Sequence, residues 1–159
     1  MRVTSSLVLA ALVATASADY QVIDFTVEVA AAIEQATVTM GTGDLLRINL
    51  PENPSAGYEW RYANPFEDMS SPYSVEMDTY VPYNSDSASE LDGSPAGAGG
   101  TRSIQLKATR SGTKKFEVIL VRSWEVEDFL ETHTAKGEPI TISQIPNFGY
   151  KSVTVNVNQ

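Results

Sequence analysis

The sequence predicts an all-β domain in which two sheets pack face to face. Three observations support this fold class: apolar and polar residues alternate with a period of two, the alternating segments are rich in β-branched and aromatic residues, and turn-forming residues separate them. About seven such strands in roughly 140 residues are typical of an immunoglobulin-like β-sandwich.

Of these strands, five segments show the alternation in full. Each has one apolar face to bury, because successive side chains of a strand point to opposite faces. In chain order they are residues 46–50, 58–62, 104–108, 116–120 and 153–157. The aliphatic residues of the first segment alternate with Arg47 and Asn49, and in the second segment three aromatic residues alternate with Glu59 and Arg61.

Two stretches are too long to be tight turns. Residues 77–100 are rich in serine, aspartate, glycine and proline, and we expect a loop there. Residues 125–150 have mixed character; residues 126–135 are expected to form a short helix that Gly137 and Pro139 end.

Composition excludes several classes of site. The chain has 159 residues, no cysteine and one histidine, which removes disulfides, thiolate metal sites, a cysteine nucleophile and most zinc centres. Its net charge of -9 disfavours nucleic acid and anionic membranes as partners. We expect no metal, no cofactor and a monomer.

The N-terminus has the layout of a secretory signal peptide. Arg2 is followed by an apolar run over residues 7–13 and then by small residues ending at Ala18, after which we expect cleavage. The apolar run is too short to span a bilayer. We therefore expect a signal peptide over residues 1–18, one domain over residues 19–159, and delivery to the secretory pathway, ending outside the cell or in a lysosomal or vacuolar lumen.

The first candidate binding element is a loop before the aromatic strand, comprising Asn53, Pro54, Ser55, Ala56, Gly57 and Tyr58. Pro54 fixes its own φ and disfavours a helical Asn53, while Gly57 tolerates a positive φ. Trp60 is expected to anchor the strand in the core. The pattern predicts a stiff loop held by a buried aromatic residue, with an ordinary strand connection as the alternative.

The second element is the glycine-rich run Gly97, Ala98, Gly99 and Gly100. A backbone without side chains can approach another surface closely and pair with an extended partner segment. A phosphate-binding loop is disfavoured, because no Gly-Lys-Ser/Thr step and no helix start follow. A flexible linker is the alternative.

The third element is Arg122, Ser123 and Trp124, directly after the strand that contains residues 116–121. In an extended chain Arg122 and Trp124 would project to the same side. Arginine and tryptophan are strongly enriched at interface hot spots. The alternative is a tryptophan folded back onto the core beside an arginine in a surface ion pair.

With these three elements in this order, the chain resembles the chagasin-type inhibitors of cysteine peptidases. That family carries an Asn-Pro-Thr-Thr-Gly-Tyr/Phe-x-Trp loop, a Gly-x-Gly-Gly loop and an Arg-Pro-Trp/Phe loop. The resemblance implies an immunoglobulin-like β-sandwich with three binding loops at one end. It also implies reversible, tight occupation of the active-site cleft of papain-like cysteine peptidases, without cleavage of the inhibitor.

By matching positions, the resemblance places the loop of Asn53–Tyr58 over the catalytic residues of the target, with the glycine run on one side and Arg122 and Trp124 on the other. Three departures from the family pattern stand out. Ser55 and Ala56 replace two threonines, Ser123 replaces a proline, and residues 126–149 form a candidate insertion. We expect each of the first two changes to weaken inhibition by about 1 kcal/mol, and the third loop to be less stiff.

Other chemistries fit the sequence less well. A hydrolase would have His133 as its sole imidazole base, and no Gly-x-Ser-x-Gly elbow accompanies it. No spacing singles out a carboxylate pair for glycoside hydrolysis. The acidic residues around Asp86 and Asp92 lack the spacing of a calcium loop. We therefore expect no enzymatic activity.

The alternative function is a non-inhibitory secreted module for adhesion or carbohydrate binding. Its motivation is a set of tyrosines expected to be exposed, since aromatic rings stack on sugar faces: Tyr73, Tyr80 and Tyr83.

Overall fold

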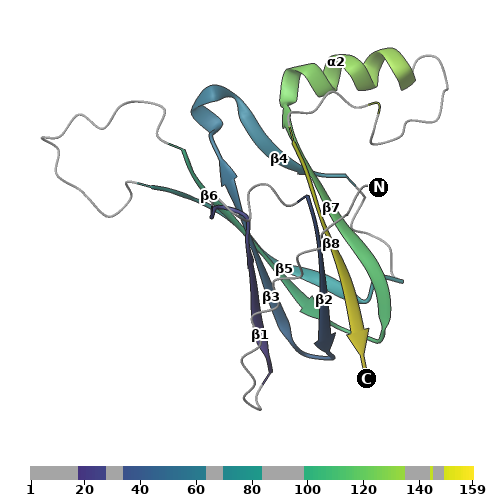
Figure 1. Ribbon diagram of the computed structural model, residues 1–159. Coiled ribbons are helices and arrows are strands. Elements are labelled where there is room, and N and C mark those ends of the chain that lie inside the picture. Colours follow the sequence, from purple (N-terminus) through teal and green to yellow (C-terminus); the bar gives the residue numbers. More distant parts are fainter. Residues whose placement is uncertain (1–17, 28–33, 64–69, 84–98, 135–143, 145–148) are drawn as a thin grey trace, which may run out of the picture.

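The computed structural model is an immunoglobulin-like β-sandwich of two four-stranded sheets (Figure 1). It describes residues 18–27, 34–63, 70–83, 99–134, 144 and 149–159, and only the backbone of residues 130–134. The first sheet has the order β1 (Tyr20–Asp24), β3 (Leu45–Glu52), β6 (Gly100–Ala108) and β5 (Tyr73–Pro82). The second has the order β2 (Gln35–Gly41), β8 (Gly149–Asn158), β7 (Gly112–Arg122) and β4 (Tyr58–Tyr62).

Strand pairing brings the three candidate elements to one end of the sandwich. β1 pairs with β3 and β2 with β8 in parallel, and the other pairs are antiparallel. The end of β3 lies beside the start of β6, with Glu52 opposite Gly100. The start of β4 lies beside the end of β7, with Tyr58 opposite Arg122. The connection from β3 to β4 therefore joins the two sheets at this end, and the C-terminus lies at the other (Figure 1).

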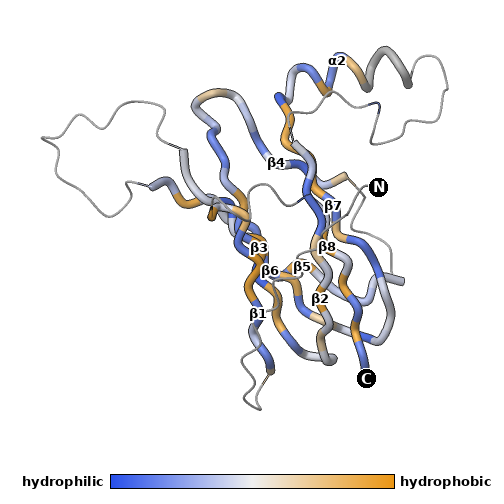
Figure 2. Tube along the Cα trace, viewed as in Figure 1, coloured by the Kyte–Doolittle hydropathy of each residue, from blue (hydrophilic) through white to orange (hydrophobic). Residues whose placement is uncertain are grey.

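The core confirms the predicted alternation. Along β3 the three aliphatic residues of the alternating segment are fully buried, and Trp60 on β4 is 3% exposed. Hydrophobic and hydrophilic residues also alternate along the strands in Figure 2. The buried side chains from both sheets form one cluster whose largest members are Phe25, Met40, Leu46, Ile48, Leu50, Trp60, Tyr73, Ile104, Leu106 and Phe116.

The structure corrects two sequence-based boundaries. β5 runs to Pro82, so the first part of the expected loop over residues 77–100 is strand, and residues 84–98 lie outside the described residues. The helix α2 (Ser123–Thr134) begins three residues earlier than expected. Val126 of α2 packs against Ile119 and Val121, on the face of β7 that points away from the main core. This second contact explains why the end of β7 is apolar on both faces.

Among the described residues, no helix is long and apolar enough to cross a membrane. The expected signal peptide falls almost entirely on residues 1–17, outside the described part of the chain.

Candidate functional site

The connection between β3 and β4 forms a tight tip. Pro54–Ala56 make one turn of 3-10 helix, η1, and Gly57 ends it in the left-handed region with φ 81°. The amide of Ala56 donates to the Asn53 carbonyl at 3.1 Å, and that of Gly57 donates to the Pro54 carbonyl at 2.8 Å. The side chains of the turn are exposed. The tip is thus a turn closed by its own backbone hydrogen bonds, and it presents Pro54, Ser55 and Ala56 to solvent.

Trp124 packs against one side of this tip. A Cβ added to Gly57 would lie 2.2 Å from Cη2 of the Trp124 indole, so the ring occupies the space that a side chain at position 57 would need. The indole is nevertheless 53% exposed. The glycine therefore has two roles: it allows the left-handed turn, and it lets a half-exposed tryptophan lie directly against the tip.

Arg122 links this tryptophan to the strand that follows the tip. Its guanidinium carbon lies 4.6 Å from the centre of the Tyr58 ring and 5.9 Å from the Trp124 ring. Nη2 of Arg122 donates to the Tyr58 hydroxyl at 2.6 Å, and Nη1 donates to Glu125 at 3.1 Å. The predicted pairing of Arg122 with Trp124 is therefore present, but its cause is different. Trp124 lies in the first turn of α2 and not in an extended chain.

Ser123, which stands where the family has proline, ties α2 to β4. Its hydroxyl donates to the carboxylate of Glu59, which also accepts from Nε of Arg61 at 2.7 Å. The hydrogen bond from Ser123 is the main reason that the pKa of Glu59 lies below its usual value. The serine thus provides an anchor for the start of α2 that a proline, which lacks a hydroxyl, would not provide.

The start of β6 and α2 lie on opposite sides of the tip (Figure 1), with Gly99 beside Asn53 and Trp124 beside Gly57. A Cβ on Gly99 would lie 2.9 Å from the Glu52 carbonyl oxygen, and one on Gly100 would lie 2.4 Å from the Val81 carbonyl oxygen. Gly100 is buried and pairs with both β3 and β5. The close backbone approach of Gly100 is therefore made within the protein, while the expected contact of the glycine run with a partner segment stays a prediction. Gly97 and Ala98 lie outside the described residues.

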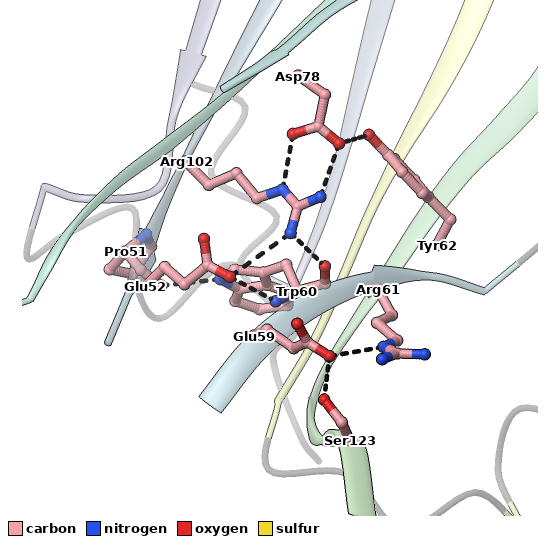
Figure 3. A network of polar contacts seen from close by, with 9 residues as sticks. All are labelled: Pro51, Glu52, Glu59, Trp60, Arg61, Tyr62, Asp78, Arg102 and Ser123. Atoms are coloured by element: carbon pink, nitrogen blue, oxygen red, sulfur yellow. Dashed lines mark hydrogen bonds and ion pairs between the residues drawn. The ribbon is translucent and has the colours of Figure 1, made fainter. Parts of the chain in front are cut away.

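Below the tip, a polar network joins the two sheets (Figure 3). Arg102 on β6 donates from Nε and Nη2 to the two carboxylate oxygens of Asp78, each at 2.7 Å, and from Nη1 to the Trp60 carbonyl at 2.7 Å. The Tyr62 hydroxyl also donates to Asp78. Since Arg102 and Asp78 belong to one sheet and Trp60 and Tyr62 to the other, this network fixes the separation of the sheets where the tip begins.

Glu52 connects the network to the tip itself. Its carboxylate accepts from the Trp60 amide at 3.1 Å and lies 3.5 Å from Nη1 of Arg102. The indole nitrogen of Trp60 donates to the Pro51 carbonyl at 2.8 Å. The strand ends on either side of the tip are therefore held together by the Glu52 carboxylate, the Trp60 indole and the Arg102 guanidinium. These contacts pre-organise the loop between the two strands.

Burial determines the electrostatics of Glu52 and Asp78 differently. Burial raises the pKa of Glu52 above 4.5, and hydrogen bonds from Trp60 and Arg102 offset this only in part. For Asp78 burial also acts upward, but the hydrogen bonds from Arg102 and Tyr62 outweigh it and hold its pKa below 3.8. The Arg102 guanidinium thus forms its stronger ion pair with Asp78. Folding favours the charged form of Asp78 and disfavours the charged form of Glu52.

Replacing Glu52 by glutamine is expected to change how stability depends on pH. The folded wild type keeps the Glu52 proton to a higher pH than the unfolded chain, so it loses stability as the pH rises above 4.5. The amide does not titrate. The unfolding free energy of Glu52→Gln minus that of the wild type should therefore increase from pH 4.5 toward neutrality, as measured by urea denaturation at a series of pH values.

Asp78→Asn provides the control with opposite sign. Because the pKa of Asp78 is lowered on folding, its contribution is present above 3.8 and is lost as the pH falls. The unfolding free energy of Asp78→Asn minus that of the wild type should therefore decrease as the pH rises. A flat or decreasing difference for Glu52→Gln would contradict the assigned burial of that carboxylate.

Replacing Gly57 by alanine is expected to displace Trp124. A left-handed alanine costs about 1 kcal/mol of folding stability, and its Cβ would overlap the indole. The tryptophan emission should therefore shift to longer wavelength and become easier to quench with acrylamide. Gly43→Ala is the matched control, because Gly43 has φ 97° with nothing within 4 Å of its Cβ position. Equal emission from both variants would exclude the proposed contact at Gly57.

The described residues bear on two of the other interpretations, carbohydrate binding and a metal site. Tyr73, expected at the surface, is 8% exposed and packs edge-to-face on Phe116, which corrects one of the three residues behind the carbohydrate-binding alternative. Within the described residues, no three histidine, cysteine or acidic side chains are grouped to hold a metal. Asp86 and Asp92 are outside that part of the chain, and the His133 side chain is not described.

Glu52 and Arg102 were not among the residues predicted from the sequence, although the sequence carries a signal for them. Glu52 continues the inward-facing series of β3, and Arg102 continues that of β6. When two residues of opposite charge both occupy inward-facing positions of strands, they indicate an ion pair between the sheets.

Known proteins resemble this chain in sequence. Residues 39–136 match the family described as chagasin family peptidase inhibitor I42. The chain is 29% identical to chagasin of Trypanosoma cruzi over 91 residues, which are 56% of this chain and 74% of chagasin. It is 30% identical to amoebiasin-2 of Entamoeba histolytica over 95 residues, 58% of this chain and 67% of that protein.

A solved structure shares the fold. The cysteine protease inhibitor EhICP2 from Entamoeba histolytica superposes with a TM-score of 0.56 and 23% sequence identity, over 87% of this chain and 96% of that one. The family match covers more than half of the chain, and its range includes the tip, the network and the start of α2. The protein belongs to the chagasin family of peptidase inhibitors.

Proposed function

We propose that the protein is a reversible, tight-binding inhibitor of papain-like cysteine peptidases that inserts one end of its sandwich into the active-site cleft. The observation that carries this function is that the tip adjoins both of the other elements. Gly57 of the tip contacts Trp124 on one side, and Asn53 lies 3.6 Å from the Cβ position of Gly99 on the other. The three elements thus form one continuous edge that can occupy a cleft.

The geometry of the tip supports inhibition without cleavage. The turn over Pro54–Ala56 is closed by its own backbone hydrogen bonds and braced at its base by Glu52 and Trp60. A tip of this kind does not become an extended segment without breaking those bonds. Because it is ordered before binding, docking costs little conformational entropy, and more of the contact energy contributes to affinity. This is enzyme inhibition by occupation, and it requires no chemistry from the inhibitor.

The residues assigned to the contact follow from their exposure. The exposed side chains of Pro54, Ser55 and Ala56 would face the catalytic centre, and Trp124 would contact one wall of the cleft. Gly99 and Gly100 would act by letting the backbone pack closely beside the tip.

Delivery through the secretory pathway is part of the same proposal. The pattern of residues 1–18 supports cleavage after Ala18 and a final location outside the cell or in a lysosomal or vacuolar lumen. Asp19 is a suitable new N-terminus, because its nitrogen lies 2.8 Å from Oδ1 of Asp44 and its carbonyl accepts from Leu45. The intact mass of the exported protein should correspond to a chain that begins at Asp19. Retention of residues 1–18 would contradict this.

The test of the function is a titration of a papain-like peptidase with the mature protein, with residual activity on a fluorogenic peptide as the readout. We expect stoichiometric loss of activity that is recovered on dilution, and no effect on a serine peptidase such as trypsin. Full activity at micromolar inhibitor would reject the proposal.

A further inference from the structure

We infer that Tyr83 is a second aromatic contact for the peptidase, on the side of the tip opposite Trp124. The inference rests on the proposed function and extends it, since Tyr83 lies outside the three elements that the family shares. It assigns the exposed ring of Tyr83 to the rim of the same cleft.

The position of Tyr83 follows from the backbone. Its amide donates to the Gly99 carbonyl at 3.2 Å, which continues the pairing of β5 with β6 by one residue beyond Pro82. The Cβ position of Gly99 lies 3.7 Å from Cε2 of the Tyr83 ring and 3.6 Å from Cβ of Asn53. The Tyr83 ring and Asn53, the first residue of the tip, thus lie next to the same glycine, whereas Trp124 lies directly against Gly57 at the last residue of the tip.

Exposure distinguishes Tyr83 from the other aromatic residues near the tip. It is 60% exposed, more than Trp124 at 53%, whereas Trp60 is buried and Tyr58 is held beneath Arg122. An apolar ring kept in water next to a binding surface loses that hydration on contact, and tyrosine offers a large contact area with few rotatable bonds. Tyrosine and tryptophan are both enriched at interface hot spots.

Interface size also favours a second contact. A stable protein complex buries about 800 Å² on each partner, contributed by some 20 or more residues. The tip, Arg122 and Trp124 provide far fewer. Of the described aromatic residues, Tyr83 is the most exposed, at 60% against 38% for Tyr80, and it adjoins the tip at Asn53, so it extends the surface there.

The experiment compares inhibition constants of three tyrosine variants. Tyr83→Ala should raise the inhibition constant about 10-fold, while Tyr83→Phe, which keeps the ring, should stay within about twofold of the wild type. Tyr20→Ala is the control, because Tyr20 is similarly exposed at 47% but lies where β3 begins, at the far end of the sandwich. Its inhibition constant should not change. An unchanged constant for Tyr83→Ala would overturn the inference.

A footprint separates contact from positioning. Nitration of tyrosines by tetranitromethane, read by mass spectrometry, should modify Tyr83 and Tyr20 in the free protein and spare only Tyr83 in the complex. Nitration of Tyr83 at an equal rate in both states would overturn the inference. If Trp124→Ala weakens inhibition and Tyr83→Ala does not, only this inference fails. If the wild type does not inhibit, the proposed function fails with it.

Discussion

Replacing Arg102 by methionine is expected to lower the free energy of unfolding by about 3 kcal/mol. The change removes the cation from between two carboxylates, and the Glu52 side chain is only 4% exposed. It also removes the hydrogen bond to the Trp60 carbonyl that joins the two sheets. Breaking one partner out of a buried charge pair is costly because the remaining charge has no compensation. Urea denaturation at pH 7 measures the loss.

The matched control is Arg61→Met. Arg61 lies 2.7 Å from Glu59, the same distance that separates Arg102 from Asp78, but the Arg61 side chain is 45% exposed and solvent screens the pair. That change should cost less than about 1 kcal/mol. The Arg102 variant should also inhibit more weakly at temperatures where it remains folded, because the base of the tip loses its support. Equal destabilisation by the two variants would show that the inter-sheet network does not stabilise the fold.

Replacing Trp124 by alanine should weaken peptidase binding by about 2 kcal/mol or more, which is roughly a 30-fold increase in the inhibition constant. The indole is half exposed, lies against Gly57 and receives the Arg122 guanidinium over its ring. A large ring fixed by two neighbours and still open to solvent is suited to contact a cleft wall. Inhibition of the same peptidase by variant and wild type gives the comparison.

Folding should be little affected by this change, because Trp124 is not part of either hydrophobic cluster. The midpoint of urea denaturation provides that control. Phe116→Ala is the converse control: Phe116 is a buried core residue far from the tip, and its loss should cost about 3 kcal/mol or more of stability. A Trp124→Ala variant with an unaltered inhibition constant would remove this residue from the contact surface.

The strands were predictable where one face is buried. Alternation over residues 46–50, 104–108 and 153–157 corresponds to β3, β6 and β8, because period-2 patterning reports which side of a strand meets the core. The start of α2 was not predictable in the same way. The segment around Ser123 has no single periodicity, and its helical conformation depends on Val126 packing against the outer face of β7, a tertiary contact.

The candidate site likewise has one part that was predictable from local sequence and one part that was not. The stiff tip, with Pro54 opening the turn and Gly57 closing it, is encoded locally and was predictable. The contacts of Gly99 and the ion pair of Arg102 with Asp78 join strands that are distant in sequence. Local pattern therefore identified which segments form the site, whereas strand pairing decides what each glycine and each charge does there.

The central claim is that one edge of the sandwich occupies the peptidase cleft. It is tested most directly by binding the immobilised mature protein to a papain-like peptidase whose cleft is either free or filled by a peptidyl reagent attached to the catalytic cysteine. Occupation of the same space predicts tight binding to the free enzyme and affinity at least about 100-fold weaker for the filled one. Equal affinity for both forms would mean that the protein binds elsewhere, and it would contradict the account.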